Sequence, residues 1–281
     1  MIHMMQSKYI NVQGYRLHYL DAGHGPTVLL LHGFGTSAES WRATGEIVAK
    51  AGYRALAFDC LGFGRSDKSR NAPYSLELIS GLYAEALEQL RIDRATIIGH
   101  SMGGKYALST ALLYPDKVTA IALVSSDGFT IAAPMNKIGK WPLISWGILW
   151  LSAHPRMVRM MLDAAFHAPD IFVTDEMIAH AREALIGWEN RHALTALSRC
   201  YDATDLQITG LRARLSDLRI PTLLIWGEND QIFPVEQSAV AAAEIPAAQL
   251  VTFPHCGHFP QIEVARPFYG LILGFLAGIK A

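Results

Sequence analysis

A serine between two glycines stands where a predicted strand gives way to a predicted helix. Residues 99–103 read Gly-His-Ser-Met-Gly, the pattern G-x-S-x-G. The apolar, β-branched run 95–98 predicts a buried strand, and residues 105–113 are rich in helix formers. So sharp a turn leaves no room for side chains two positions before and after the serine, and glycines occupy both positions. A chance glycine-serine turn is the alternative, but the flanking elements favour a nucleophile elbow with Ser101 as the nucleophile.

The sequence also offers a base and an acid for this serine. A serine hydroxyl attacks well only when a neighbouring base takes its proton and a third group orients that base. Asp230 and His258 each follow a predicted strand late in the chain. Serine, acid, histidine is a known chain order for such a triad, so we expect Asp230 to orient His258. Asp127, which also ends a predicted strand, is the alternative acid, and His255 is the alternative base.

The third requirement is a pair of N–H donors for the negative charge that develops on the substrate oxygen. Residues 31–35, Leu-His-Gly-Phe-Gly, end the first buried strand. One donor in this arrangement is the N–H after the nucleophile, here that of Met102, and the other lies in the loop after this strand. We assign the second donor to Phe34 and expect His32 to hold the loop. Each donor contributes about 2.7–4 kcal/mol of transition-state stabilisation.

No metal or organic cofactor is expected. His255 and His258 are close in sequence, but no acidic or cysteine cluster completes a metal site around them. The cysteines, Cys60, Cys200 and Cys256, have unrelated spacings that fit neither a disulfide framework nor a zinc site. Unpaired cysteines suit a reducing compartment, so we expect a cytoplasmic protein.

Composition excludes several other classes of protein. The chain has 281 residues, of which 51% are hydrophobic and 17% charged, as expected for a globular protein with a sizeable core. A net charge of −1 gives no basic surface, so nucleic acid is not an expected partner. The first nine residues lack the apolar run of a signal peptide. Residues 142–153 are very apolar but too few to span a membrane, which takes about 20. The oligomeric state stays open between monomer and dimer.

Strands and helices alternate over most of the chain. Apolar runs without alternation predict strands covered on both faces, at residues 27–31, 55–58, 95–98, 120–124, 222–226 and 250–253. Helical patterns lie between or after them, at residues 40–51, 76–90, 102–113, 235–244 and 264–276. Two alternating segments, 8–12 and 15–20, flank Gln13-Gly14 and predict a hairpin. The alternation predicts right-handed βαβ units and a sheet with helices on both faces.

The alternation stops between residues 130 and 214, where helical patterns occur without a convincing strand. The sheet resumes after this stretch, so we interpret residues 130–214 as a helical cap inserted into one core domain of residues 1–129 and 215–281. The first half of the cap carries Trp141, Trp146 and Trp150. Most such side chains pack as core, but a cap above the serine also roofs the pocket. An apolar roof favours an apolar acyl or aryl group.

Together these motifs resemble the α/β-hydrolase superfamily, in its branch of capped esterases and carbon–carbon hydrolases. The motifs in the family's order are His32-Gly33, Asp59-x-x-Gly62-x-Gly64-x-Ser66, the elbow, Gly227-x-x-Asp230 and Gly257-His258. The resemblance implies an α/β fold with a mostly parallel eight-stranded sheet, helices on both faces and an inserted helical cap. In the family, the segment that corresponds to residues 59–66 is a structural turn without a catalytic role.

The nucleophile and its neighbours narrow the reaction. Haloalkane dehalogenases and epoxide hydrolases of this fold carry an aspartate at the elbow, where this chain has Ser101. Meta-cleavage-product hydrolases use serine, but typical members have a glycine-proline-glycine loop, an asparagine before the serine and a tryptophan after the histidine. At those positions this chain has Phe34-Gly35-Thr36, His100 and Phe259. Cofactor-free perhydrolases usually show a tryptophan where Phe34 stands.

These departures favour hydrolysis of a carboxylic ester, lactone or thioester through an acyl-enzyme. Carbon–carbon bond hydrolysis of a meta-cleavage product is the first alternative. A ligand-binding receptor on a hydrolase fold, with little turnover, is the alternative from another class of protein. We expect the substrate to be a small to medium apolar, ester-like molecule. The residues expected to bind it are Gly35, Phe129, Trp141, Trp150 and Phe259.

Overall fold

The computed structural model describes residues 4–129, 153–200 and 205–279. Within them, eight strands form one sheet in the order β1-β2-β4-β3-β5-β6-β7-β8. The strands are β1 (Gln6–Val12), β2 (Tyr15–Gly23), β3 (Thr27–Leu31), β4 (Arg54–Phe58), β5 (Ala95–His100), β6 (Val118–Val124), β7 (Thr222–Gly227) and β8 (Ala248–Phe253). Strand β2 is antiparallel to β1 and β4, and the other neighbouring pairs are parallel. The predicted mostly parallel, eight-stranded sheet is confirmed.

A two-residue turn joins β1 to β2. Gln13 and Gly14 have φ angles of 50° and 81°. Positive φ at both central residues is typical of a type I′ turn, whose twist matches that of the flanking strands. Val12 pairs with Tyr15 across this turn, so the predicted hairpin is confirmed together with its turn.

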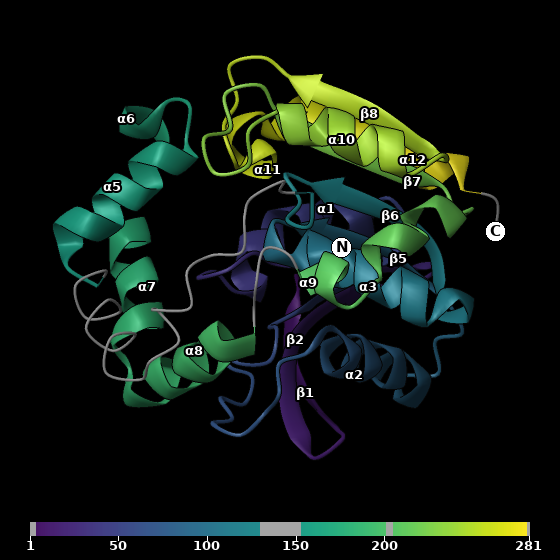
Figure 1. Cartoon of the computed structure of the whole chain (residues 1–281), viewed down its shortest axis with the longest axis horizontal. Coiled ribbons are helices and arrows are strands. Elements are labelled where there is room, and N and C mark those ends of the chain that lie inside the picture. The colour runs from purple at the N-terminus through teal and green to yellow at the C-terminus, as the bar shows by residue number, and fades with distance from the viewer. Residues whose placement is uncertain (1–3, 130–152, 201–204, 280–281) are drawn as a thin grey trace.

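Helices cover both faces of the sheet (Figure 1). The longer ones are α1 (Arg42–Lys50), α2 (Leu76–Gln89), α3 (Met102–Leu113), α10 (Glu236–Glu244) and α12 (Ala265–Gly278), and the short ones are η1 (Ala38–Trp41), η2 (Pro115–Lys117) and α11 (Pro260–Glu263). Leu29 and Leu31 of β3 belong to the core formed with α2 and α3, whereas Val28 and Leu30 belong to the core formed with α1 and α12. Successive side chains of a strand point to opposite faces, so burial on both sides explains the unbroken apolar runs in the sequence.

Helices fill the described part of the chain between β6 and β7. They are α5 (Pro155–Ala165), α6 (Pro169–Phe172), α7 (Asp175–Ile186), α8 (Trp188–Cys200), α9 (Asp205–Ile208) and η4 (Arg212–Asp217). Figure 1 shows α5 to α8 grouped to one side of the sheet, and we call residues 153–200 the cap helices. The division into a core of residues 1–129 and 215–281 and a cap of residues 130–214 stays a prediction. In the part of the chain that is described, no helix is long and apolar enough to cross a membrane.

The segment 59–66 is a turn organised by one buried carboxylate. Asp59 accepts hydrogen bonds from the N–H groups of Ala38 and Arg65 at 2.6 and 2.7 Å, and its Oδ2 lies 2.7 Å from Nδ1 of His18. Burial on its own would raise the pKa of Asp59. The hydrogen bond from His18 and the backbone donors outweigh burial and hold this pKa below its ordinary value. These contacts agree with the structural role expected for the segment.

Candidate active site

Ser101 lies directly after β5 in a strained backbone conformation. Its φ and ψ angles are 54° and −120°, a region that costs a residue with a side chain on the order of 1–3 kcal/mol. Its N–H donates to the carbonyl oxygen of Val124 at 2.9 Å, which ties the elbow to β6. A Cβ on Gly103 would overlap the carbonyl oxygen of Leu31, and a Cβ on Gly99 would overlap Gly103. The two glycines are therefore required by close packing, as the elbow pattern predicts.

The structure brings Asp230 and His258 into contact at the same edge of the sheet. Asp230 follows β7, His258 follows β8, and Oδ2 of Asp230 lies 2.8 Å from Nδ1 of His258. The other carboxylate oxygen accepts the N–H groups of Ile232 and Phe233, each at 2.9 Å. Both side chains of the pair are buried. Because both carboxylate oxygens are engaged, the carboxylate is fixed and can hold the imidazole in one orientation.

The alternative acid and the alternative base face other partners, although the backbone N–H of Asp127 donates to the carbonyl oxygen of Ser101 at 3.1 Å. Asp127 faces Lys105, whose Nζ lies 2.9 Å from Oδ2 of Asp127 and 3.2 Å from Oδ2 of Asp205. His255 is exposed, and its ring lies 5.5 Å from that of His167. The geometry therefore favours Asp230 over Asp127 and His258 over His255 for the proposed triad with Ser101.

His100, next to the proposed nucleophile, supports the loop that carries His258. Its Nε2 donates a hydrogen bond to the carbonyl oxygen of His258 at 2.8 Å. Its ring lies 4.7 Å from that of His258 and 4.8 Å from that of Phe259. Burial lowers the pKa of His100 well below its ordinary value, and the neighbouring His258 lowers it further. His100 is therefore neutral near pH 7 and acts as a hydrogen-bond donor.

His32 holds the loop after β3, as expected. Its Nδ1 donates to the carbonyl oxygen of Gly33 at 2.7 Å, and its Nε2 accepts the N–H of Cys60 at 2.9 Å. Gly33 in turn packs against Ser101, so His32 places this loop beside the elbow.

The two proposed oxyanion donors belong to two segments that meet at the elbow, the start of α3 and the loop after β3. Met102 begins α3, and the N–H groups of a first helical turn have no acceptor within the helix. Phe34 follows Gly33, and its side chain is 45% exposed and packs edge-on against Phe63, with ring centroids 5.5 Å apart. The backbone N–H groups of Phe34 and Met102 remain our proposed donors to the oxyanion.

Three of the five residues predicted to bind substrate are described. Phe259 stacks on Phe166 of the cap helices, with ring centroids 4.8 Å apart and 13° between the ring planes. Phe129 is fully buried, and Gly35 has a φ of 72°. Trp141 and Trp150 lie outside the described residues. The lining of the substrate pocket therefore stays a prediction.

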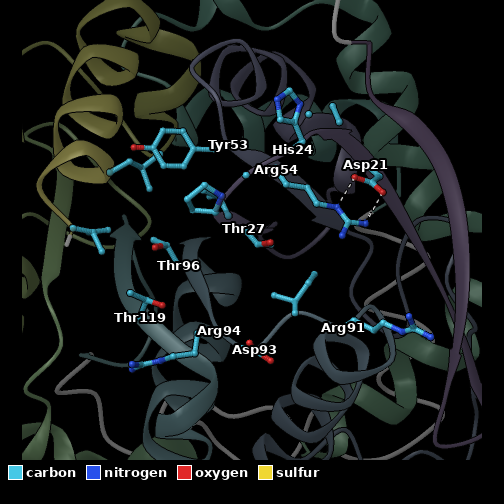
Figure 2. Close-up of a pocket in the computed structure, with 18 of the residues that line it drawn as sticks. Asp21, His24, Thr27, Tyr53, Arg54, Arg91, Asp93, Arg94, Thr96 and Thr119 are labelled. Atoms are coloured by element: carbon cyan, nitrogen blue, oxygen red, sulfur yellow. Dashed lines mark hydrogen bonds and ion pairs between the residues drawn. The ribbon is translucent and has the colours of Figure 1, made fainter. Parts of the chain in front are cut away.

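A cavity of about 1390 Å³ opens at the opposite edge of the sheet (Figure 2). Thr27, Arg54 and Thr96, which lie at the amino ends of β3, β4 and β5, line it. Ser101 and His258 follow the carboxyl ends of their strands, the edge at which open α/β sheets bind ligands. The cavity is therefore separate from the candidate active site. No group of three His, Cys, Asp or Glu residues in the described ranges could hold a metal ion.

Two charged residues beside the site are not among the predicted site residues. Lys105 is the only charged residue between positions 102 and 113, and its side chain is fully buried. A single charged residue in an otherwise apolar helix indicates a buried ionic partner. The sequence could therefore have predicted a buried ion pair for Lys105. Glu263 accepts the N–H of Gly257 at 2.9 Å. Nothing in the sequence around Glu263 marks this contact.

The sheet order, the serine elbow after β5 and the Asp230–His258 pair define a protein of the α/β-hydrolase fold. The sequence pattern of the Alpha/beta hydrolase family matches residues 28–270, and the chain belongs to this family.

The chain is 33% identical over 268 residues to a 2-hydroxy-6-oxononadienedioate/2-hydroxy-6-oxononatrienedioate hydrolase from Cupriavidus pinatubonensis, with 93% of this chain and 91% of that protein covered. It is 32% identical to a 2-hydroxy-6-oxo-6-phenylhexa-2,4-dienoate hydrolase from Burkholderia cepacia, with 95% and 94% covered. The structure of a meta-cleavage product hydrolase from Pseudomonas fluorescens IP01 superposes with a TM-score of 0.83 at 30% identity, over 97% of this chain and 98% of that one.

Proposed function

We propose that this protein hydrolyses a carbon–carbon bond in a 2-hydroxy-6-oxo-dienoate. The observation that supports this proposal is similarity along the whole chain to hydrolases named for such compounds, at 32–33% identity over more than nine-tenths of both chains. The similarity therefore extends beyond the elbow and the Asp230–His258 pair into the cap. This similarity favours hydrolysis of a carbon–carbon bond over hydrolysis of an ester. Ester hydrolysis is the prediction from Phe34, His100 and Phe259, where the sequence differs from typical meta-cleavage-product hydrolases.

The proposed residues account for the attack, cleavage and hydrolysis steps of such a reaction. The dienol substrate first tautomerises to a vinylogous diketone: its 2-hydroxyl group gives up a proton and C5 takes one. Oγ of Ser101 attacks the C6 carbonyl carbon while His258 takes the serine proton, and the N–H groups of Phe34 and Met102 stabilise the oxyanion. Collapse of this intermediate breaks the C5–C6 bond, the electron pair leaves with the conjugated fragment, and His258 returns the proton to that fragment. Water activated by His258 then releases the carboxylic acid.

Two of the departures have a structural explanation that is compatible with this reaction. His100 donates to the carbonyl oxygen of His258, and an asparagine side chain carries the same type of N–H donor. Phe259 stacks on Phe166, a contact that any aromatic ring at this position can make. His100 and Phe259 therefore both support the loop of His258. Having these residues in place of the asparagine and tryptophan of typical carbon–carbon hydrolases is compatible with the proposed triad of Ser101, His258 and Asp230.

The substrate's carboxylate needs a cationic partner, and Arg191 of α8 is our candidate. Its Nε is buried and donates to no acceptor among the described residues. A buried donor without an acceptor costs about 1–3 kcal/mol, and more when it is charged. A bound carboxylate would recover this cost, since a guanidinium matches a carboxylate in charge and shape.

Ester or lactone hydrolysis is the second candidate function. It is favoured by Phe34, whose exposed ring stands beside the elbow where typical carbon–carbon hydrolases have a glycine-proline-glycine loop. A bulky residue there changes the space next to the oxyanion, which is the part of the pocket that a flat, conjugated ketone must enter.

A direct comparison of substrates tests the proposal. The purified protein is assayed with 2-hydroxy-6-oxo-6-phenylhexa-2,4-dienoate and with nitrophenyl esters from acetyl to hexanoyl, and products are identified by mass spectrometry. We expect kcat/KM for the dienoate to exceed that for the best ester at least tenfold, with benzoate as a product and no turnover by Ser101→Ala. Arg191→Met should raise KM for the dienoate and leave KM for a neutral ester unchanged. A tenfold preference for the ester would replace the first candidate by the second, and the absence of any turnover would favour the receptor.

A further inference from the structure

The loop that carries His258 is held by the cap helices and by one glutamate. The N–H of His258 itself donates to the carbonyl oxygen of Ala165, the last residue of α5, at 2.7 Å. The N–H groups on either side, those of Gly257 and Phe259, donate to Oε1 of Glu263 at 2.9 and 3.4 Å. Three successive N–H groups around the proposed base are thus engaged by groups outside the loop.

Glu263 also reaches the cap helices. Its second oxygen, Oε2, accepts the N–H of His167 at 2.7 Å, two residues after the carbonyl that receives the N–H of His258. A single carboxylate therefore joins the segment 165–167 to the loop 257–259. Glu263 is half-buried, and hydrogen bonds to an ionised group in such a place are worth more than neutral ones.

Gly257 permits this close approach of the cap to the loop. A Cβ at this position would lie 2.6 Å from the carbonyl oxygen of Ala165 and 2.8 Å from the N of His167. Gly257 does not have a positive φ angle. The lack of a side chain is therefore required by the contact with the cap helices and not by the backbone conformation.

We propose that Glu263 is a positioning residue that couples docking of the cap helices to the placement of His258. When Ala165 and His167 are in place, these hydrogen bonds of the loop are made, and the imidazole is held against Asp230. When the segment 165–167 moves away, the N–H of His258 loses its acceptor and Glu263 loses one of its donors. The base is then correctly placed only under a docked cap, so water is excluded before the serine is activated. The inference rests on His258 as the base, which both candidate functions share.

Glu263→Gln tests the coupling because it keeps the size of the side chain. A glutamine amide has one oxygen, while N–H donors approach both ends of this carboxylate. With the oxygen toward Gly257, the NH₂ group faces the N–H of His167, so the link to the cap helices is lost. Glu228→Gln is the matched control, because Glu228 lies near Asp230 in sequence and its carboxylate accepts the hydroxyl of Thr252 in a solvent-exposed hydrogen bond of 2.9 Å.

Three measurements distinguish a role in positioning His258 from a role in stability, and they do not depend on the natural substrate. The rate of labelling of Ser101 by a fluorophosphonate reports on its activation by His258 without any assumption about the natural substrate. We expect Glu263→Gln to slow labelling and kcat for nitrophenyl acetate about 10²-fold, as for a misplacement of about 1 Å, with KM within twofold. Hydrogen exchange should accelerate at residues 163–168 and 256–260 together, and Glu228→Gln should match the wild type in all these measurements.

Three results would overturn the proposal. They are labelling within twofold of the wild type, a rise in KM without a fall in kcat, and faster exchange at only one of the two segments. Should Glu263→Gln fail to fold, Gly257→Ala tests the same contact, because its Cβ pushes the cap helices away and leaves the carboxylate intact. It should show the same slow labelling and the same paired exchange. If labelling falls as expected while no dienoate is turned over, the coupling stands and only the proposed function is lost.

Discussion

The roles of Asp230 and Asp127 are separated by two isosteric substitutions. In Asp230→Asn, the amide oxygen stays toward the N–H groups of Ile232 and Phe233, which donate to the present Oδ1. The amide NH₂ then faces Nδ1 of His258, so Nδ1 must accept and the ring proton moves to Nε2. An imidazole protonated at Nε2 cannot take the proton of Ser101. We expect kcat to fall about 10⁴-fold, as in a comparable triad, which corresponds to about 5.4 kcal/mol in activation free energy.

Asp127→Asn should instead lower stability and leave the rate nearly unchanged. The carboxylate of Asp127 lies 2.9 Å from Nζ of Lys105, and both side chains are buried. Breaking a buried ion pair by removing one partner costs about 3–5 kcal/mol. Asp205 still faces Lys105 at 3.2 Å, so we expect the lower end, about 3 kcal/mol. At about 2–4 °C per kcal/mol for a chain of this size, the unfolding midpoint should fall by about 6–12 °C.

Steady-state kinetics and thermal unfolding of both variants test this separation. The assay uses nitrophenyl acetate, so that the result does not depend on the natural substrate, and the rate is measured at least 20 °C below the unfolding midpoint of each variant. The expected pattern is a large loss of kcat with an unchanged midpoint for Asp230→Asn, and the reverse for Asp127→Asn. A greater loss of kcat in Asp127→Asn would refute the assignment of the orienting acid.

Three further predictions follow from other parts of the structure. Lys105→Met should lower the free energy of unfolding in urea by about 3–5 kcal/mol, because it removes the buried cation that both carboxylates face. Adding Asp127→Asn and Asp205→Asn should recover more than half of that loss. Asp59 has a depressed pKa in the folded chain, so its ionised form stabilises the fold above its ordinary pKa of 3.8, and this contribution is lost as the pH falls through the folded value. The stability difference between the wild type and Asp59→Asn should therefore be largest at pH 7 and shrink below about pH 3.8, as urea unfolding at several pH values will show. For esters, kcat/KM should rise about fourfold per added methylene from acetyl to butanoyl if the cap's tryptophans roof the pocket, since each buried methylene contributes about 0.8 kcal/mol; a flat series would place them away from it.

The central sheet could be predicted because its strands are buried on both faces. Residues 27–31 and 95–98 are apolar without alternation, and they form β3 and most of β5 as expected. The outer strand β8 begins at Ala248, two residues before the predicted start at position 250. Gln249 of this strand is exposed, so an edge strand lacks the apolar pattern that marked the central ones. Burial on both faces therefore makes the central strands easy to predict from the sequence, and partial exposure makes the edge strand harder to predict.

The candidate nucleophile could also be predicted, because an elbow needs glycines at fixed positions. The choice between the two aspartates could not. Asp127 and Asp230 both follow strands of the sheet, β6 and β7, and each is a plausible partner for a histidine. The difference is Lys105, which lies 22 residues before Asp127 in the chain and occupies its carboxylate. Pairing between distant charges depends on how α3 packs on the sheet, and no local pattern records that.

The contact between the cap helices and the loop of His258 could not be predicted from the sequence, for a different reason. Ala165 and His167 contribute only a backbone carbonyl and a backbone N–H, and every residue except proline carries both groups. Their side chains therefore say nothing about the contact. Gly257 is the one residue of the contact whose type is required, because Ala165 and His167 leave no room for a Cβ there although its φ angle is not positive. In the sequence that glycine looks like part of the turn before the histidine, whereas the structure shows that it makes room for the cap.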